Sequence, residues 1–542
     1  MKKTLSLILS AVMSMTILSA CSGGSTEKGT GEGGNTKNSN VVYNGEFGQI
    51  VEEPVDLKIH LSQENINVIT TDLPLYKYLS EKTGINIIGT ANPGAGDSLG
   101  EFNLSAADGF PDDIYAGDKL GNMFMQFGAE GAFVPLNDYL DQMPNFSAFL
   151  EKDPRVAASI TAPDGNIYYI PYMQSDVTTS KTYFIRKDWL DKFNKPIPST
   201  VQELEETLLT LINSDANGNG EKDEFGFFAR RSEEVIRLAN LFGTRVFAND
   251  SFSQRFIPKD NGVYHAWIQP EFKEAIKNVS RWYDLGIIDN EYLTNPNSRR
   301  DHFLLNDLGA MTYDWMASTS GYNEKDIVEG FDFVPFEPPT NVNGEQVNEH
   351  TRPVIKNNGW AISAKCENVE AAVALFDMMF TEYGRTVANF GVEGQQWDYV
   401  NGVPTFKDSV LNNEEGKPVN LYLRDKIGAQ LFIGFKQDYE YERQWTSEGG
   451  LKALDIYGSG EFDVPTLPTL VYTSEELDIL NKYLSNINTF LDESVHTWIS
   501  QPYEKLTDEV WDEYLTQVQK LGLEEVEKVY QDAYARYIEN MK

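Results

Sequence analysis

Apolar and polar positions along the chain follow two different periods, and the changes between them predict alternating strands and helices. Residues 55–61 alternate apolar and polar side chains with a period of two, as a half-buried strand does. Leu75, Tyr78 and Leu79 then follow helical spacing up to Gly84, and residues 85–88 predict a second strand. A strand, a helix and a second strand in this order predict a parallel sheet with helices on its faces, and therefore an α/β fold.

Two threonines, each with a glutamate three residues later, predict where long helices begin. Thr200 opens a predicted helix over 201–212, and Thr473 opens a longer one. Behind Thr473 one helical face stays apolar for about 25 residues. This face includes Trp498, and the apolar face of the next predicted helix includes Trp511. We therefore expect both tryptophans to be core residues.

Residues 215–224 place oxygen-bearing side chains at nearly every second position after the helix predicted over 201–212. A hard cation such as Ca²⁺ binds six or more such oxygens at roughly 2.3–2.6 Å. The twelfth position of an EF-hand would be Gly226, which has no ligand atom, and residues 225–229 predict a strand rather than a second helix. The loop therefore predicts a structural calcium site, and a solvated turn is the alternative. The expected ligands are the side chains of Asp215, Asn217, Asn219, Asp223 and Glu224 and the carbonyl of Glu221.

The N-terminal segment predicts export and lipid anchoring. Two lysines precede an apolar run over 5–18 that is too short to span a bilayer. The run ends in Leu18-Ser19-Ala20-Cys21, which resembles the lipobox of bacterial lipoproteins. We expect residues 1–20 to be a signal peptide, Cys21 to carry acyl chains such as palmitate, and residues 21–42 to be a flexible stalk. A secretory signal with a chance cysteine is the alternative. The expected location is the extracellular face of the cell membrane, with no membrane contact beyond the lipid.

The charge balance excludes some partners. The formal net charge is −37 over 542 residues, and it becomes −39 when the signal peptide is removed. Such a polyanion does not bind nucleic acid or anionic lipid non-specifically. The second cysteine, Cys366, has no intrachain partner once Cys21 is lipidated, so we expect no disulfide. The roughly 500 residues after the stalk are enough for two or more cores.

Several runs along the chain carry a family resemblance. In chain order they are Ala162–Pro171, Arg186–Leu190, Pro198–Leu204, Tyr283–Asp289, Gly309–Met311 with Trp315, and Leu521–Arg536. Together they resemble the extracellular solute-binding proteins of family 1, and the calcium loop resembles the large lipoprotein branch that contains the alginate-oligosaccharide-binding proteins. The resemblance implies a periplasmic-binding-protein type II-like fold, in which two α/β lobes close by a hinge on a central cleft. By analogy, residues 43–172 and 350–400 form the N-lobe, and residues 173–349 and 401–542 form the C-lobe.

The same resemblance implies a monomeric binding protein that delivers an oligosaccharide to the permease subunits of an ABC importer, without chemistry on the ligand. Two alternatives remain open: a glycan-active enzyme (glycosidase or lyase), and a lipoprotein that binds peptides or another solute. Residues 96–100 also match the G-x-S-x-G pattern of serine esterases. A nucleophile elbow must follow a buried strand directly, whereas a loop over 92–95 precedes this pattern. We therefore expect no enzymatic activity.

Sugar binding predicts aromatic side chains with polar neighbours. Pyranose rings stack their apolar faces on aromatic rings, and their hydroxyl groups bond to amides, carboxylates and guanidinium groups. The candidates are Trp315, which family analogy puts at the cleft, and Trp360, Trp397, Tyr172 and Trp445, with the acids Asp314 and Glu393. Each aromatic could instead be an ordinary core residue.

The charge of the ligand is the least determined property. A strongly acidic chain repels anionic sugars unless arginines or lysines converge at the site. The tandem arginines are Arg230-Arg231 and Arg299-Arg300, and the sequence places neither pair at the cleft. We therefore favour a neutral oligosaccharide over a uronate.

Overall fold

The computed structural model of the protein describes residues 40–63, 70–91, 97–177, 179–294, 296–431 and 434–542. The expected signal peptide, the lipidation site at Cys21 and most of the expected stalk lie outside these residues. The part from Asn40 to Lys542 forms one compact unit. Among the described residues, no helix combines the length and the apolar character that crossing a bilayer requires.

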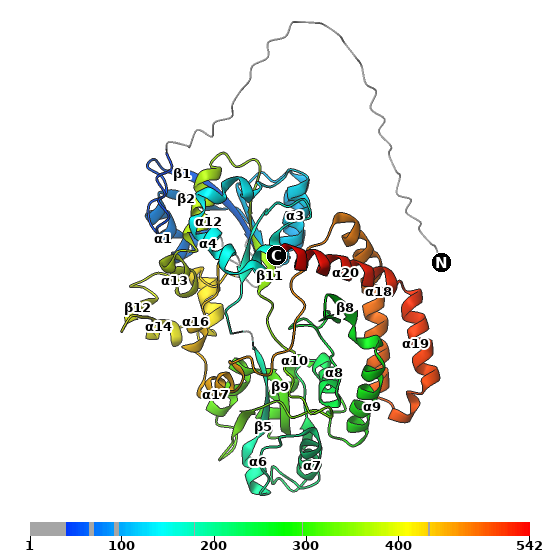
Figure 1. Cartoon of the computed structure of the whole chain (residues 1–542). Coiled ribbons are helices and arrows are strands. Elements are labelled where there is room, and N and C mark those ends of the chain that lie inside the picture. The colour runs from blue at the N-terminus through cyan, green and yellow to red at the C-terminus, as the bar shows by residue number, and fades with distance from the viewer. Residues whose placement is uncertain (1–39, 64–69, 92–96, 178, 295, 432–433) are drawn as a thin grey trace, which may run out of the picture. The chain divides into compact units, whose positions relative to one another are not determined.

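The first sheet has five strands in the order β2-β1-β3-β11-β4. Their bounds are β1 Val55–Ser62, β2 Ile85–Gly89, β3 Ile114–Gly117, β4 Ile170–Met173 and β11 Ile355–Ile362. β1 pairs in parallel with β2 and β3, whereas β11 runs antiparallel to β3 and β4. Helix α1 (Pro74–Thr83) connects β1 to β2 and ends at Gly84, whose φ of 78° allows the left-handed turn. The predicted strand–helix–strand unit is confirmed (Figure 1).

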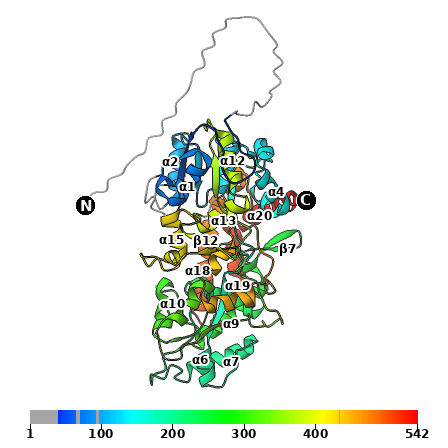
Figure 2. The same cartoon turned by 90° about the vertical axis from the view of Figure 1, so that its left-hand side faces the viewer.

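Apolar side chains around this sheet form a first core. Its helices are α2 (Ser98–Ala107), α3 (Gly121–Ala129), α4 (Pro144–Lys152), α5 (Pro154–Ile160), α12 (Val369–Met378), α13 (Glu382–Phe390), α14 (Asp408–Leu411), α15 (Val419–Tyr422) and α16 (Tyr439–Arg443). Figure 2 shows α1, α2 and α12 in this part of the chain. A hairpin of β12 (Trp397–Val400) and β13 (Val403–Phe406) belongs to the same part. Phe406, Leu423 and Phe435 are buried in the first core, although analogy assigned residues 401–542 to the other lobe.

The second sheet has four strands in the order β10-β5-β9-β6. Their bounds are β5 Lys181–Arg186, β6 Phe225–Phe227, β9 Gly309–Trp315 and β10 Phe333–Phe336. β6 and β9 are parallel, and the other pairs are antiparallel. Along β5 the side chains alternate between two cores, because Tyr183 and Ile185 pack into one core and Phe184 packs into the other. The sheet is therefore covered on both faces.

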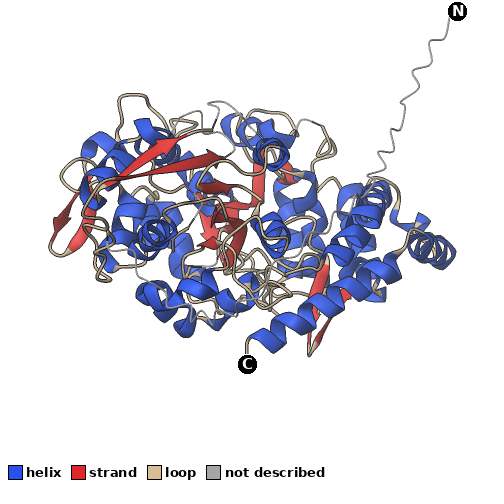
Figure 3. Ribbon diagram, turned by 90° about the horizontal axis from the view of Figure 1, so that it is seen from above, coloured by secondary structure: helices blue, strands red, loops and turns tan. Residues whose placement is uncertain are grey.

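The larger of these two cores, which contains Tyr183 and Ile185, is called the second core. Helices pack against both this core and the smaller one, which contains Phe184. The helices of the two cores are α6 (Lys187–Lys192), α7 (Val201–Ile212), α8 (Ser232–Arg237), α9 (Pro270–Asp284), α10 (Pro296–Leu305), α11 (Met316–Ser320), α17 (Glu448–Tyr457), α18 (Ser474–Ile499), α19 (Asp508–Lys520) and α20 (Leu523–Asn540). A hairpin of β7 (Phe256–Lys259) and β8 (Gly262–His265) packs against α20. Helix α18 contacts α9, α19 and α20 (Figure 1). Figure 3, coloured by secondary structure, shows helices on several sides of the strands. Trp498 and Trp511 are buried there, as predicted.

The two predicted helix starts are present, with different capping. At α18 the Thr473 side chain accepts from the backbone N–H of Glu476, and the Glu476 carboxylate accepts from the N–H of Thr473. At α7 the Thr200 hydroxyl accepts from Glu203 N, but the Glu203 carboxylate accepts from Ser199 N at 2.9 Å instead. Both arrangements satisfy amide groups that the first turn of a helix leaves without partners.

Candidate functional site

A cavity of about 650 Å³ lies where the two sheets meet the segments that connect them. Trp315 lines it from the carboxyl end of β9, and Arg230 and Arg231 follow the carboxyl end of the parallel strand β6. Tyr172 of β4 and Lys356 of β11 line it from the first sheet. Ligand sites of α/β sheets form at the carboxyl ends of parallel strands, where loops leave the sheet. We call this cavity the arginine chamber, for the reason given below.

Three of the five predicted aromatic residues line this chamber: Tyr172, Trp315 and Trp445. The ring of Trp315 is held by two neighbours, because Lys181 Nζ lies 5.4 Å from its centroid and the His350 ring meets it edge-on at 5.2 Å. Trp445 is half-buried and tilted against Tyr441, with ring centroids 6.1 Å apart. Tyr172 is almost fully buried, and burial raises the pKa of its hydroxyl well above the usual value.

The other two predicted tryptophans do not line the chamber. Trp360 lies within β11, not before a strand, and stacks on Phe376 in the first core at a centroid distance of 4.4 Å. Trp397 is fully buried, and its indole N–H donates to the Gly391 carbonyl at 2.9 Å. Both are core residues in this structure.

The two predicted acids also lie away from the chamber lining. Asp314 is fully buried, accepts from the guanidinium of Arg300 at 3.1 Å, and accepts from the backbone N–H of Trp315 at 2.7 Å. It therefore supports the tryptophan that follows it. Glu393 is exposed and accepts from the hydroxyl of Tyr383 at 2.9 Å.

Several buried polar atoms in the lining have no hydrogen-bond partner within the described part of the chain. They are Gln174 Nε2, Gln437 Oε1 and the indole Nε1 of Trp445. Buried polar groups are almost always paired, since leaving one unpaired costs about 1–3 kcal/mol. Atoms of this kind that face a cavity mark the positions where a bound molecule supplies the missing partner.

Cations outnumber acids in the lining. The cations are Arg230, Arg231, Arg352, Lys356 and Arg424, and the acids are Asp250 and Glu442. Burial lowers the pKa of Lys356 and of Arg230, and raises the pKa of Asp250. Arg352 and Glu442 lie 3.4 Å apart, so one of the two acids already forms an ion pair with a cation of the lining. The lining of this cavity therefore carries more positive than negative groups, although the chain as a whole has a formal net charge of −37.

A second cavity, of about 500 Å³, adjoins the first. The two share Asp250, Lys356 and Arg424 in their linings. Six side-chain amides line the second cavity: Gln63, Asn122, Asn249, Gln254, Asn357 and Asn358. We call it the amide chamber. Gln63 and Asp118 reach it from the carboxyl ends of β1 and β3, the parallel strands of the first sheet.

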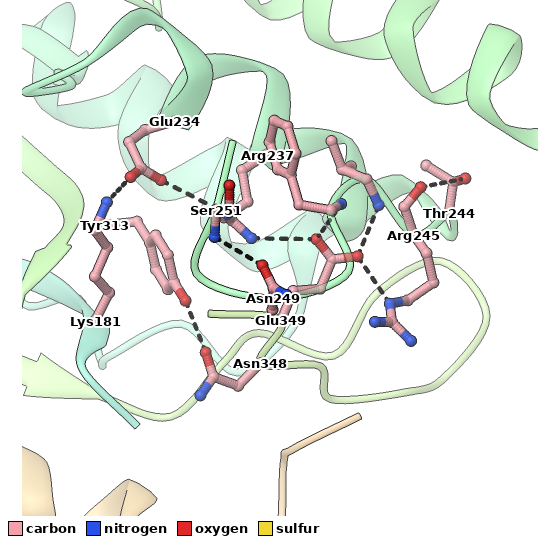
Figure 4. A network of polar contacts seen from close by, with 12 residues as sticks. Lys181, Glu234, Arg237, Thr244, Arg245, Asn249, Ser251, Tyr313, Asn348 and Glu349 are labelled. Carbon is pink, nitrogen blue, oxygen red and sulfur yellow. Dashed lines mark hydrogen bonds and ion pairs between the residues drawn. The ribbon is translucent and has the colours of Figure 1, made fainter. Parts of the chain in front are cut away.

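Figure 4 shows a buried ion-pair network, and its member Lys181 contacts the ring of Trp315. Lys181 pairs with Glu234, and the other oxygen of Glu234 accepts from Arg237 Nε at 3.2 Å. Arg237 also donates to Glu349, which accepts from Arg245 Nε at 2.9 Å as well. The Glu349 carboxylate further accepts from the backbone N–H groups of residues 246 and 247. Because residue 349 lies in the segment between β10 and β11, the network ties that segment to the second sheet.

The predicted calcium loop forms a compact turn between α7 and β6. The Asp215 carboxylate accepts from Gly220 N at 3.2 Å, and Asn217 Oδ1 accepts from Asn219 N at 3.0 Å. The Asp223 carboxylate accepts from the amides of Asn217 and Asn219. Within the described residues, no group of three or more His, Cys, Asp or Glu side chains gathers as a metal site. The oxygens of the loop are thus directed toward the loop's own amides.

One buried oxygen atom of the loop does not accept a hydrogen bond from a loop amide in the described structure. Glu224 is only 6% exposed, and its Oε1 accepts from Asn217 N at 3.0 Å. Its Oε2 is buried without a hydrogen-bond partner in the described structure. A buried carboxylate oxygen with no donor is costly, and a cation is the partner it lacks. The loop residues therefore fit a cation, with Glu224 as the side chain that needs it most.

Sequence comparison gives the chain a family. Residues 69–386 match the bacterial extracellular solute-binding protein family. A fructooligosaccharide ABC transporter substrate-binding protein, FusA of Streptococcus pneumoniae, is 24% identical over 502 residues, which cover 85% of this chain and 86% of FusA.

Solved structures agree with this match. The alginate-binding protein AlgQ2, in a structure without calcium ion, has 37% sequence identity and a TM-score of 0.74, covering 90% of this chain and 99% of AlgQ2. An EF-hand mutant of S. pneumoniae FusA in complex with fructo-nystose has the same fold, with 20% identity and a TM-score of 0.68, covering 90% of this chain and all of that one. The expected two-lobe α/β fold is confirmed.

Proposed function

Because the chain belongs to the bacterial extracellular solute-binding protein family, we propose that it captures an oligosaccharide outside the cell and delivers it to an ABC importer. The observation that carries this proposal is the lining of the arginine chamber, where two indole rings stand beside buried polar atoms without partners. An indole face takes the apolar side of a sugar ring, and the unpaired atoms take its hydroxyl groups.

Two of the lining groups illustrate the fit. Gln437 holds the Tyr441 hydroxyl through its Nε2 at 3.1 Å, which fixes the amide and leaves its Oε1 directed to a donor that the described protein does not supply. The Trp445 indole N–H needs an acceptor. A sugar hydroxyl is both donor and acceptor, so sugar hydroxyl groups can supply the partner that each of these two groups lacks.

We propose that the first and second cores are the two lobes of a clamp. Residues 174–180 and 337–354 connect strands of the two sheets, and Gln174 and Arg352 within them line the arginine chamber. A ligand that contacts both lobes binds the closed arrangement more tightly than the open one, and so shifts the population toward closure. The permease then receives a closed, loaded protein. On this proposal residues 401–441 belong to the lobe of the first core.

Isothermal titration calorimetry against a glycan panel, with a peptide library as comparison, tests the function. We expect one glycan class to bind in the micromolar range or tighter with no turnover by mass spectrometry. Release of smaller sugars would indicate a glycan-active enzyme, and binding of peptides alone would indicate a different solute. Either result overturns the proposal.

We further propose that Ca²⁺ binds the 215–224 loop as a structural ion. The six predicted ligands carry oxygen atoms, and the unpaired Glu224 Oε2 supports the assignment. A cation there neutralises the carboxylates of Asp215, Asp223 and Glu224 and fixes the turn that leads into β6. The AlgQ2 structure named above is described as being without calcium ion and the FusA structure as an EF-hand mutant, and both descriptions agree with a calcium site in proteins of this kind.

We also propose that Cys21 is the lipid attachment site and that the protein is held on the extracellular side of the membrane. The lipobox-like run Leu18–Cys21 supports this. Expression with its own leader should give a membrane-associated protein whose N-terminal peptide has the mass of an acylated cysteine. Substitution Cys21→Ser should release the protein into the medium. An unmodified Cys21 in the mature protein would contradict the proposal.

A further inference from the structure

The two chambers differ in the hydrogen-bonding groups that they offer to a ligand. We propose that they bind one oligosaccharide whose acidic, carboxylate-bearing unit occupies the arginine chamber and whose uncharged units occupy the amide chamber. This inference rests on the proposed function and names the class of its ligand: a glycan with negative charge at one end of the bound stretch.

The arginine chamber is rich in donors. Guanidinium and ammonium groups donate and never accept, and the planar fork of arginine matches a carboxylate. No carboxylate of the described chain lies within ion-pair distance of Arg230 or Arg231. Arg231 is exposed and has the Phe252 ring 5.5 Å from its guanidinium carbon. The indole N–H of Trp445 adds an unpaired donor to the same wall. An acceptor with negative charge is the ligand group that these donors lack.

The charges of this chamber also repel one another. Five cations face two acids across a cavity of about 650 Å³. The pKa of Lys356 is lowered by burial, partly offset by Asp250 and lowered further by Arg352 and Arg424. Like charges gathered in one cavity cost folding free energy, and proteins retain them at functional sites. A bound carboxylate relieves this repulsion, while a neutral sugar leaves it unchanged.

The amide chamber, in contrast, lacks hydrogen-bond donors among the described residues for some of its acceptor oxygens. Gln63 Oε1 and Asn122 Oδ1 line it, and both are buried acceptor oxygens with no donor in the described structure. A sugar hydroxyl can donate to them, but an ionised carboxylate has no proton to give. The charged groups found in this lining and not in the other are Asp118 and Lys119, whose formal charges cancel. This chamber therefore favours uncharged units and disfavours acidic ones.

The chambers are parts of one binding surface. Asp250, Lys356 and Arg424 belong to both linings, so a ligand can pass from one cavity to the other along these side chains. The positive charge falls from five cations against two acids in the arginine chamber to three against two in the amide chamber. A charge gradient along a cleft orients a ligand that is itself charged at one end. This proposal thus departs from the preference for a neutral ligand, which rested on the net charge and on the absence of a sequence signal that placed an arginine pair at the cleft.

Competitive capture with mass spectrometry tests this inference. The full mature protein is mixed with equal amounts of neutral oligosaccharides, homopolymeric uronate oligomers, neutral oligosaccharides that carry one uronic acid, and the sulfated counterparts of the last group. We expect the singly acidic class to be retained. Preferential retention of the neutral class, of the homopolymeric uronates or of sulfated chains overturns the inference and leaves the proposed function standing. Retention of no glycan overturns both.

Paired variants give an independent test with the retained oligosaccharide and its carboxyl-reduced form. Arg230→Gln with Arg231→Gln should weaken binding of the acidic ligand by about 10- to 100-fold and should change binding of the reduced form by less than about threefold. The control is Arg385→Gln with Arg443→Gln, which removes the same charge from exposed positions outside both linings. This control should leave both affinities unchanged.

The amide chamber has its own variant. Asn122→Ala removes an unpaired acceptor, and it should weaken the acidic ligand and its reduced form by the same factor. Equal losses for both ligands in the double arginine variant, or a loss confined to the acidic ligand in Asn122→Ala, would contradict the assignment of the two chambers. Circular dichroism and melting temperature of each variant confirm that it is folded.

Discussion

Lys181 Nζ lies 5.4 Å from the centroid of the Trp315 ring, so a buried ion-pair network touches the aromatic wall of the arginine chamber. Lys181 and Glu234 are 2% and 1% exposed, and they form an ion pair. The same ammonium group lies 4.8 Å from the ring of Phe252. The network therefore holds one face of the proposed sugar platform while its far end, at Glu349, holds the segment that leads to β11.

Removal of Lys181 should destabilise the protein. Lys181→Met leaves the buried Glu234 with Arg237 alone, and breaking a buried pair in this way costs about 3 kcal/mol. Urea unfolding measures the loss. The double variant Lys181→Met with Glu234→Gln should recover part of it, because the second change removes the uncompensated charge. Lys187→Met breaks a pair with Asp191 at the surface and should cost less than about 1 kcal/mol. Equal costs at the two lysines would show that burial of the pair is unimportant.

Stability should fall in mild acid through His265. This ring is fully buried beside Phe256, and burial, aided by the positive Arg255, lowers its pKa from 6.5 to about 3. Below pH 6.5 the His265 ring is protonated in the unfolded chain but stays neutral in the folded chain. The free energy of unfolding therefore decreases as the pH falls toward 3. At pH 5 the loss from this group is about 2 kcal/mol.

The measurement is the difference in unfolding free energy between pH 7.5 and pH 5, for wild type and for His265→Phe. The variant should lose about 2 kcal/mol less than wild type over this interval. His302→Gln, at an exposed position, should follow wild type. An identical pH dependence in His265→Phe and wild type would show that His265 does not remain neutral in the folded state.

Calcium should stabilise the folded protein. An ion that binds the native state alone adds about 2.7 kcal/mol at a concentration one hundred times its Kd. The melting temperature should therefore rise with added Ca²⁺ and fall with chelator, and Glu224→Gln should weaken the response. Glu206→Gln changes an exposed acid on the preceding helix and should leave it intact. A melting temperature that chelator does not change would exclude the structural ion.

The predicted tryptophans should separate into two classes. Trp315→Ala removes a stacking surface from the arginine chamber and should weaken glycan binding by about 10- to 100-fold with little loss of stability. Trp397→Phe removes a buried ring and its bond to Gly391, and should lower stability while the folded fraction binds normally. Calorimetry and thermal unfolding of both variants check this division. Normal glycan binding by Trp315→Ala would remove that residue from the site.

Replacing Gly359 with any larger residue should destabilise the first sheet. A Cβ at this position would lie 2.4 Å from the carbonyl oxygen of Ile170, because β11 is packed between β3 and β4. Forcing the strands apart should cost roughly 1–3 kcal/mol in Gly359→Ala. Gly48 has open space around the same position, so Gly48→Ala is the control that should change little. Thermal unfolding distinguishes the two, and equal stability would show that the sheet yields at β11.

Local patterns predicted local structure well. The helix between β1 and β2 and the apolar face of α18 follow from side-chain spacing within one segment, which the sequence contains in full. Trp315 was a candidate because it ends a predicted strand and because family analogy put it at the cleft, and it does line the arginine chamber. Trp360 has the polar neighbours of a binding residue, but Phe376 covers its ring, and that contact arises only in the folded chain.

The charged part of the site could not be predicted in the same way. Arg352, Lys356 and Arg424 come from a connecting segment, from β11 and from the π-helical stretch Leu423–Ile427, and nothing in their sequence neighbours marks them as a group. Among the cations of the lining, only Arg230 and Arg231 stood out in the sequence, because they are a tandem pair that directly follows the strand predicted at 225–229. The sequence favoured a neutral ligand because the net charge is negative and neither arginine pair could be placed at the cleft, and an average over the whole chain does not show a local excess of positive charge.

The position of β11 has a consequence for the order in which the protein is made. Among the described strands of the first sheet, β4 is hydrogen-bonded to β11 alone, and β11 begins at Ile355, after every described strand of the second sheet. As the chain leaves a ribosome or a membrane pore from its N-terminus, the second sheet has all its strands while the first still lacks β11, the strand that joins β3 to β4. The edge of β3 stays unpaired during that interval and is open to pairing with another chain. The first sheet therefore begins earlier in the sequence than the second sheet but gains its last strand later, and during this interval the newborn protein depends on chaperones.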